Sequence, residues 1–537
     1  MGMRRRAKVM LACLFILFFG LIVRLTLIAV DNQVQTVGVN QGSRALTVAQ
    51  VRGTIYDRNL TPLVNASNTY YATMLPEERL LQCIDSVIDQ TEYNHIFGAL
   101  DSGTPLVARL NGPAAICDGI RVYLVPHRYG DNTLAAHLLG YLDGSGCDGV
   151  CGIEKAYDNV LDQFSGRITA TYSVDGQGRY VANDGIQVLN TAKNYAGGVV
   201  TTLDGKIQKT VEDVASVMIN KGTVIVMEPN TGDVLSLASF PSYDPANISN
   251  QLSEIEGSLV NRALARYDCG SVFKIVTALA ALENGVSSDQ VYDCPGSITV
   301  DGTVFHCHYR LGHQQLTMEE AFAQSCNVYF IQLASQIGAD ALLEMAKTLG
   351  LNDTIELAQT ISSPAAVMPN HSDLSSASAL ANLSFGQGKL LISPLHIARM
   401  TAVIASNGTL PEVSVVLGTV DENGNWLSST DRGGETVISS QSVQALRRMM
   451  TLAVSNGTGT AASADIGVSA GKTGTAETGQ VNNNRAVVHS WFTGYYPADD
   501  PRYVITIFIE DKESNDASAA QVFGSVVNSL DCEEINK

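Results

Sequence analysis

The stretch Asp268-Cys269-Gly270-Ser271-Val272-Phe273-Lys274 decides how the rest of this 537-residue chain is interpreted. An apolar run follows it as far as Leu282 and predicts a helix that begins near Ser271. At a helix N-terminus, free backbone N–H groups and the helix dipole favour developing negative charge. Lys274 would lie one turn further on the same face, where a neutral amine can take the serine proton. Alone this spacing is weak evidence, because Ser469-Ala470-Gly471-Lys472 has it as well.

Two more short motifs carry reactive side chains. Ser325-Cys326-Asn327 follows a helix that a capping-box pattern, Thr317-x-x-Glu320, predicts to begin at residue 318. Its serine can relay a proton, and its asparagine amide can bind a substrate amide. Lys472-Thr473-Gly474-Thr475 precedes a predicted strand, and a glycine on an edge strand lets an extended peptide approach closely. Taken singly, the second motif is better explained as a polar loop, and an exposed turn with a lysine is an open alternative for the third.

The order and spacing of the three motifs change that interpretation. The second motif begins 54 residues after the first, and the third begins 147 residues after the second. Together they match the S-x-x-K, S-x-N and K-T-G set of penicillin-recognising serine acyltransferases.

The flanking pattern predicts an α+β fold, with an antiparallel sheet, flanking helices and an all-helical lobe. A hairpin is predicted from two β-prone runs, 223–227 and 234–238, around Pro229-Asn230-Thr231-Gly232. The other predicted elements are a strand at 197–203, a helix after Asp204, strands at 487–494 and 503–510, and a helix at 517–530. Residues 240–460 are expected to be mostly helical.

Beyond these motifs, the chain resembles a class B penicillin-binding protein, a monofunctional peptidoglycan D,D-transpeptidase. The resemblance rests also on five further stretches: Arg52-Gly53-x-Ile55-x-Asp57-Arg58, Gly152-Ile153-Glu154, Asn261-Arg262-Ala263-Leu264, Phe385-Gly386-Gln387-Gly388 and Ser490-Trp491-Phe492-x-Gly494-Tyr495. It implies a pedestal, dimerisation-like domain at 31–195 and a transpeptidase domain at 196–537. The chain ends 63 residues after Gly474, so a short type without C-terminal wall-binding repeats is expected.

The resemblance also implies roles for the motif residues. Ser271 would attack a stem pentapeptide, with Lys274 as the general base. Ser325 and Lys472 would complete the network that passes the proton to the leaving amine. Asn327 would hold a substrate amide, and Thr473, Gly474 and Thr475 would receive the terminal carboxylate. The backbone N–H groups of Ser271 and Thr475 would form the oxyanion hole. A β-lactam would mimic the substrate and acylate Ser271, and no cofactor or metal is implied.

The N-terminus predicts a bacterial membrane anchor. Basic residues at 4, 5, 6 and 8 precede an apolar run at 9–30, interrupted by Arg24. Such a run can cross a hydrocarbon core of about 30 Å. The basic flank places residues 1–8 in the cytoplasm and the catalytic domain outside the cell, in a single-pass protein. A cleaved signal peptide is the alternative, although Ala29-Val30-Asp31 fits a cleavage site poorly.

The net charge and the family resemblance limit which partners and which other functions are expected. With 34 Lys and Arg against 53 Asp and Glu, the net charge of −19 argues against nucleic-acid binding. The resemblance implies a membrane glycosyltransferase partner of the shape, elongation, division and sporulation group. The alternatives are a D,D-carboxypeptidase or β-lactamase-like hydrolase, and a non-catalytic β-lactam sensor or wall-synthesis scaffold.

The ten cysteines leave their pairing open. Cys269 stands where the family usually has proline; a bridge to Cys326 is conceivable, but two unpaired core residues are favoured. Cys147 and Cys151 could form a local disulfide. Zinc is considered for Cys294 and Cys307 with three nearby histidines, His306, His308 and His313. Because the C-x-x-C spacing is absent, a cysteine pair of an exported loop is preferred and no metal is predicted.

Overall fold

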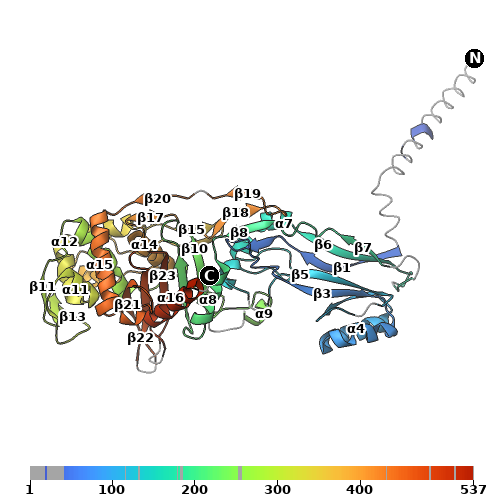
Figure 1. Ribbon diagram of the computed structural model, residues 1–537, viewed down its shortest axis with the longest axis horizontal. Coiled ribbons are helices and arrows are strands. Elements are labelled where there is room, and N and C mark those ends of the chain that lie inside the picture. The colour runs from blue at the N-terminus through green and yellow to red at the C-terminus, as the bar shows by residue number, and fades with distance from the viewer. Residues whose placement is uncertain are drawn as a thin grey trace, which may run out of the picture. The chain divides into compact units, whose positions relative to one another are not determined.

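A computed structural model describes residues 18–20, 24, 42–114, 117–130, 133–177, 179–181, 186–251, 257–430, 432–482, 485–512 and 516–535 (Figure 1). The predicted span 9–30 therefore lies almost wholly outside the described residues. Within the described part of the chain, no helix is long and apolar enough to cross a membrane.

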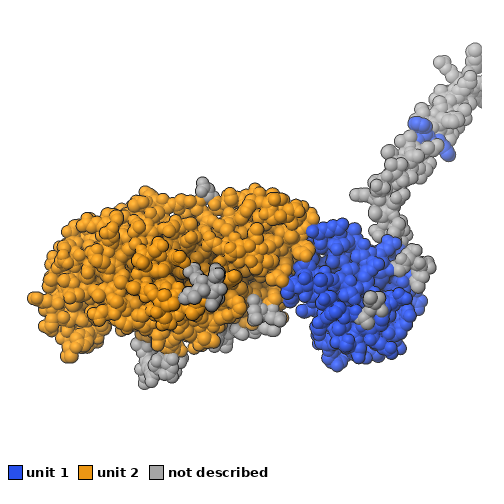
Figure 2. Space-filling model, viewed as in Figure 1, with its two compact units in different colours: residues 1–51, 67–127, 165–193 blue, residues 52–66, 128–164, 194–537 orange. Residues whose placement is uncertain are grey.

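The chain divides into two compact units (Figure 2). Unit 1 comprises Met1–Val51, Ser67–His127 and Ser165–Lys193, and unit 2 comprises Arg52–Ala66, Arg128–Phe164 and Asn194–Lys537. The chain enters unit 2 for the last time close to the predicted boundary at 195/196. However, two segments of the predicted pedestal, 52–66 and 128–164, belong to unit 2.

Unit 1 contains two small antiparallel sheets of three strands each. One has the order β1 (Ser43–Val51), β6 (Gly166–Ser173), β7 (Gln187–Asn190), and the other the order β4 (Leu106–Leu110), β3 (Ser67–Met74), β5 (Ile120–His127). Helix α4 (Gln90–Ser102) contributes Ile96 to the apolar core of the second sheet. A disulfide joins Cys83 to Cys117.

Unit 2 is built on a five-stranded antiparallel sheet. Its order is β10 (Val234–Phe240), β9 (Gly222–Met227), β23 (Tyr503–Ile509), β22 (Arg485–Tyr496), β21 (Ala470–Asn482). Successive side chains of β9 alternate between two cores, because strand side chains point to opposite faces. Val224 and Val226 join one core, and Ile225 and Met227 the other.

Helices cover both faces of this sheet. Helices α8 (Gly205–Ala215) and α16 (Ala519–Ile535) pack together over one face, as Figure 1 shows. Helix α14 (Pro394–Ala405) packs against β9, β22 and β23 on the other. Beyond it lies the helical lobe, formed by α10 (Lys274–Glu283), α11 (Met318–Ala323), α12 (Asn327–Thr348), α13 (Ala377–Ser384) and α15 (Ser440–Asn456).

Local sequence signals explain how several of these elements begin. The Asp204 side chain accepts hydrogen bonds from the N–H groups of Lys206 and Ile207 and caps α8 as predicted. Thr317 and Glu320 form the predicted capping box of α11. The predicted hairpin at 223–238 is confirmed as β9 and β10. The helix expected to begin at Ser271 differs, because Gly270–Phe273 is a 3₁₀ turn and α10 begins at Lys274.

The predicted strand at 197–203 belongs to a second sheet. It is β8 (Gly198–Thr201), in the order β19 (Trp426–Ser429), β18 (Val416–Val420), β8, β2 (Thr54–Tyr56), and the β8–β2 pair is parallel. The R-G-x-I-x-D-R stretch thereby becomes part of unit 2. Its Arg52 forms ion pairs with Asp158 at 2.6 Å and Glu154 at 3.4 Å, so the two pedestal motifs meet there.

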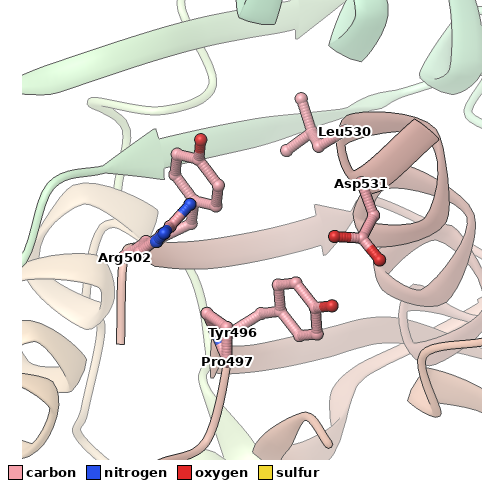
Figure 3. Close-up of a pocket in the computed structure, with 6 residues that line it drawn as sticks. Tyr496, Pro497, Arg502, Leu530 and Asp531 are labelled. Atoms are coloured by element: carbon pink, nitrogen blue, oxygen red, sulfur yellow. The ribbon is translucent and has the colours of Figure 1, made fainter. Parts of the chain in front are cut away.

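A small surface pocket lies where β22 ends (Figure 3). Its lining comes from both ends of the β22–β23 turn and from α16, and includes Tyr496, Arg502, Leu530 and Asp531. No motif residue lines it.

Candidate active site

The nucleophile candidate Ser271 lies in a tight turn between the sheet and the helical lobe. Gly270, just before it, has a φ of +54°, and a Cβ there would lie 2.4 Å from the Thr475 carbonyl oxygen. Only glycine allows this close approach of the turn to β21. The turn therefore places Ser271 directly beside the K-T-G strand.

Three other groups hold this turn in place. The Gly270 N–H donates to the Gly386 carbonyl at 3.1 Å, and Gly386 itself has a φ of +80°. A Cβ on Gly474 would lie 2.7 Å from Val272, so this glycine also permits a close contact. The buried Trp491 indole donates to the Asp268 carbonyl at 2.9 Å. Residues of two stretches quoted from the sequence, F-G-Q-G and S-W-F-x-G-Y, thus hold in place the turn that carries Ser271.

The first two motifs meet at the amine of Lys274. Its Nζ lies 3.1 Å from Ser271 Oγ, 3.1 Å from Ser325 Oγ and 2.7 Å from Asn327 Oδ1. It also donates to the Ser325 carbonyl at 2.7 Å. Ser325 has a φ of +52°, an uncommon conformation for a residue with a side chain, which marks a constrained site.

The third motif joins through Lys472, whose Nζ donates to Ser325 Oγ at 3.0 Å. A continuous chain of polar groups therefore runs from Ser271 through Lys274 and Ser325 to Lys472. Strand β21, which carries Lys472, lies at an edge of its sheet. Its free edge can pair with an extended peptide.

Burial sets the protonation of the two lysines, since both side chains are fully buried. Burial lowers the pKa of Lys274 to about 7, and the sulfur groups of Cys326 and Cys307 oppose that shift. Burial also holds the pKa of Lys472 well below its usual range, and the charge of Lys274 adds to this effect. An amine with a pKa near neutrality can serve as a general base at physiological pH.

All the residues predicted for the site are placed around this network. Ser271, Lys274, Ser325, Asn327 and Lys472 are linked by hydrogen bonds. Thr473, Gly474 and Thr475 follow Lys472 along β21, where the Thr475 side chain is exposed and the Thr473 side chain is partly exposed.

The family model of the penicillin binding protein transpeptidase domain matches residues 222–528, more than half of the chain. The chain belongs to this family.

Individual relatives agree with that assignment. Penicillin-binding protein PbpB of Mycolicibacterium smegmatis is 30% identical over 434 residues, covering 75% of this chain and 64% of the relative. Peptidoglycan D,D-transpeptidase PbpA of the same organism is 28% identical, covering 78% of this chain and 85% of the relative. The structure of penicillin-binding protein A from M. tuberculosis in its imipenem acyl-enzyme complex has a TM-score of 0.62 and 26% identity, covering 76% of this chain and 93% of that one. The chain thus spans less than two thirds of the length of PbpB.

Sequence reasoning missed one polar contact of this penicillin-binding protein. The Thr458 hydroxyl lies 2.7 Å from the Thr473 hydroxyl and so orients a predicted carboxylate ligand. Thr458 follows α15 in an Asn-Gly-Thr-Gly turn, whose composition indicates a turn but not its position beside β21.

The cysteines also differ from expectation. No disulfide joins Cys147 to Cys151, Cys269 to Cys326, or Cys294 to Cys307 in the described structure. Cys269 is a buried core residue, as favoured from the sequence. The predicted pair of Cys294 and Cys307 is wrong, because each instead faces His313.

Proposed function

We propose that this chain is a peptidoglycan D,D-transpeptidase, which crosslinks stem peptides in bacterial cell wall synthesis through an acyl-enzyme on Ser271. The observation that carries the proposal is the hydrogen-bonded network joining Ser271, Lys274, Ser325 and Lys472. Membership of the transpeptidase family and the names of the relatives support it.

The first half-reaction transfers an acyl group to the serine. Neutral Lys274 takes the Ser271 proton as Oγ attacks the carbonyl of the penultimate D-Ala. The peptide bond breaks, and the terminal D-Ala leaves after its nitrogen receives a proton through Ser325. The N–H groups of Ser271 and Thr475 stabilise the oxyanion, the contribution that is usually largest in such catalysis.

The second half-reaction forms the crosslink. An amine from a neighbouring stem attacks the ester, and its proton returns through the same network while the Ser271–acyl bond breaks. Asn327 holds a substrate amide, and Thr473 and Thr475 hold the terminal carboxylate beside β21. A β-lactam would enter the same site and leave Ser271 acylated, as the imipenem acyl-enzyme of the related protein supports.

A hydrolase would need a water activated near the ester. Within the described residues, the hydrogen-bond partners of Ser271, Lys274, Ser325 and Lys472 are hydroxyl, amide, amine and carbonyl groups, with no carboxylate. This composition favours a long-lived acyl-enzyme, which an acceptor amine then resolves.

Gel labelling of the full chain with a fluorescent penicillin tests the proposal. We expect a stable band that Ser271→Ala abolishes and that Ser455→Ala keeps, since Ser455 is exposed on α15 and bonds only within that helix. A band that fades within minutes would indicate a hydrolase. A folded wild-type chain that never labels would indicate a non-catalytic scaffold. Exchange of terminal D-Ala for a labelled D-amino acid would then demonstrate acyl transfer.

We infer further that residues 9–30 anchor the protein in the bacterial membrane, with the catalytic unit outside the cell. The basic residues before this run support the orientation. The Cys83–Cys117 disulfide supports an exported location, because disulfides persist in oxidising compartments. We expect the full chain to resist carbonate extraction from membranes and to be digested by protease added to spheroplasts. Release by carbonate, or protection from protease, would contradict this topology.

We also propose that the segment 31–195 acts as a pedestal and that the anchor contacts a membrane glycosyltransferase of the shape, elongation, division and sporulation group. Arg52 and Asp57 are each 3% exposed and bonded within unit 2, so substituting them would first weaken the fold. A chain with 9–30 replaced by an unrelated apolar span is a better probe. It should keep penicillin labelling and lose copurification with the glycosyltransferase; unchanged copurification would contradict a contact through the anchor.

A further inference from the structure

Behind the S-x-N motif, four potential metal ligands from separate positions within residues 294–326 lie close together. They are the sulfur atoms of Cys294, Cys307 and Cys326 and a ring nitrogen of His313, all within 4.8 Å of one another. The three cysteines are each at most 1% exposed. A buried cluster of thiols and imidazole is an environment suited to a soft or borderline metal ion.

Three of the distances within the cluster match a tetrahedral zinc site. With Zn–S bonds of about 2.3 Å and a Zn–N bond of about 2.0–2.1 Å, a regular tetrahedron separates two sulfurs by about 3.8 Å and a sulfur and a nitrogen by about 3.6 Å. The Cys307 and Cys326 sulfurs lie 3.8 Å apart. His313 Nδ1 lies 3.6 Å from the Cys294 sulfur and 3.5 Å from the Cys307 sulfur.

Disulfide bonding explains this arrangement less well. A disulfide brings two sulfurs to about 2.05 Å and would leave one of the three cysteines over. It would also give no reason for His313 Nδ1 to face two sulfurs at once. Four ligand atoms turned toward one centre are explained by a shared ion.

The backbone around the cluster is shaped to bring the ligands together. Cys294 ends β11 (Tyr292–Cys294), Cys307 follows β13 (Thr303–His306), and His313 precedes β14 (Gln314–Leu316). Gly296 and Gly312 have φ values of +97° and +81°. A Cβ on Gly312 would lie 2.3 Å from the Cys294 carbonyl oxygen, so this glycine allows the His313 loop to pass against Cys294.

The fourth ligand ties this hairpin region to the catalytic motif. Cys326 lies between Ser325 and Asn327 and is the N-cap residue of α12, where its sulfur accepts the Tyr329 N–H at 3.4 Å. Such an outer hydrogen bond orients a metal ligand. The Asn327 amide also donates to the His306 carbonyl at 3.3 Å, which adds a second link between the motif and the hairpins.

We propose that Cys294, Cys307, Cys326 and His313 bind one structural zinc ion. Four protein ligands complete its tetrahedral shell and leave no open position for substrate, so the ion is not catalytic. On binding, the three thiols release their protons to solvent and the histidine binds as the neutral ring. The ion fastens the β11–β14 hairpins to α12 and makes Cys326 a positioning residue for Ser325 and Asn327; this second role rests on the proposed function.

Metal analysis of the full chain, purified with a histidine-free tag under reducing conditions, tests the site. We expect about one zinc per chain in the wild type and less than about a tenth of that in Cys294→Ser and His313→Ala. His313→Cys should keep zinc, because four thiolates also form a structural zinc site. Cys269→Ser, which removes a buried thiol outside the cluster, should keep it too.

A second measurement avoids variants that fail to fold. Stripping the wild type with a chelator should lower its melting temperature and slow penicillin acylation, and added Zn²⁺ should restore both. Co²⁺ added to the stripped chain should give the visible bands of a tetrahedral thiolate site. A wild-type chain without zinc, or with a disulfide between any two of these cysteines, would overturn the proposal. Because Ser271→Ala should keep zinc while losing the label, failure of the metal site and failure of the proposed activity are distinguishable.

Discussion

Substituting Gly270 by alanine tests whether the nucleophile turn depends on close packing against β21. The φ of +54° at Gly270 disfavours alanine by about 1–2 kcal/mol. In addition, the new Cβ would lie 2.4 Å from the Thr475 carbonyl oxygen. Since carbon–oxygen contacts normally begin near about 3.3 Å, the turn and the strand must separate by about 0.9 Å. A displacement of this size between reacting groups costs on the order of 100-fold in rate.

Gly285→Ala is a matched control for the backbone strain. Gly285 has a φ of +80°, and a Cβ there meets nothing within 4 Å. In denaturant titration both variants should lose about 1–2 kcal/mol of unfolding free energy from backbone strain, and Gly270→Ala should lose more because of its clash with β21. Only Gly270→Ala should lose about 100-fold in the rate of fluorescent penicillin acylation. Wild-type acylation in Gly270→Ala, or an equal loss in Gly285→Ala, would refute the packing argument.

Three further predictions concern the base, a buried carboxylate and the disulfide. Because the pKa of Lys274 is about 7 and only its neutral form accepts a proton, the acylation rate should fall about tenfold from pH 8 to pH 6 in stopped-flow labelling, and a flat profile would contradict this role. Glu154→Gln, which removes a fully buried carboxylate from two arginines, should cost about 3 kcal/mol in denaturant unfolding, while Asp175→Asn, at a partly exposed ion pair, should cost far less. Cys83→Ser opens a bridge between residues 34 apart and should destabilise unit 1 by about 3–4 kcal/mol in thermal unfolding, with penicillin labelling in unit 2 unchanged; a loss of labelling would show that the units are coupled.

Local signals explain the elements that the sequence predicts correctly. The β9–β10 hairpin combines two β-prone runs with a Pro-Asn-Thr-Gly turn, and α8 begins at an aspartate cap. The three motifs are specific because their residue types, order and spacing recur together. These features need no knowledge of which segments meet in space, so sequence reasoning reaches them.

Contacts between segments that are far apart in the chain cannot be predicted from the local sequence. Strand β8 pairs in parallel with β2, although more than 140 residues separate them, and this pairing moves Arg52 out of the predicted pedestal. The 3₁₀ turn at Ser271 likewise depends on contacts with Gly386 and Thr475. Packing of this kind leaves no periodic pattern in the local sequence.

The cluster of Cys294, Cys307, Cys326 and His313 is likewise not predicted by local sequence patterns. The sequence argues against zinc, because the candidate ligands lack a C-x-x-C spacing. That spacing describes two ligands from one turn, whereas here each of the four ligands comes from a different place in the fold. The absence of a C-x-x-C spacing therefore argues against a zinc knuckle, but it does not test a site whose ligands are brought together by tertiary packing.

The middle residue of the S-x-N motif explains how such a cluster can coexist with the reaction. Ser325 and Asn327 both contact the Lys274 amine, and the intervening Cys326 side chain contacts Cys307 instead. The two outer side chains are constrained by their contacts with Lys274, whereas in the described part of the chain the Cys326 sulfur bonds to Cys307 and to the Tyr329 N–H. A ligand there can fix the backbone of both neighbours, including the left-handed Ser325, without entering the reaction. A structural metal bound at the middle position can therefore stabilise the active site without taking part in the reaction.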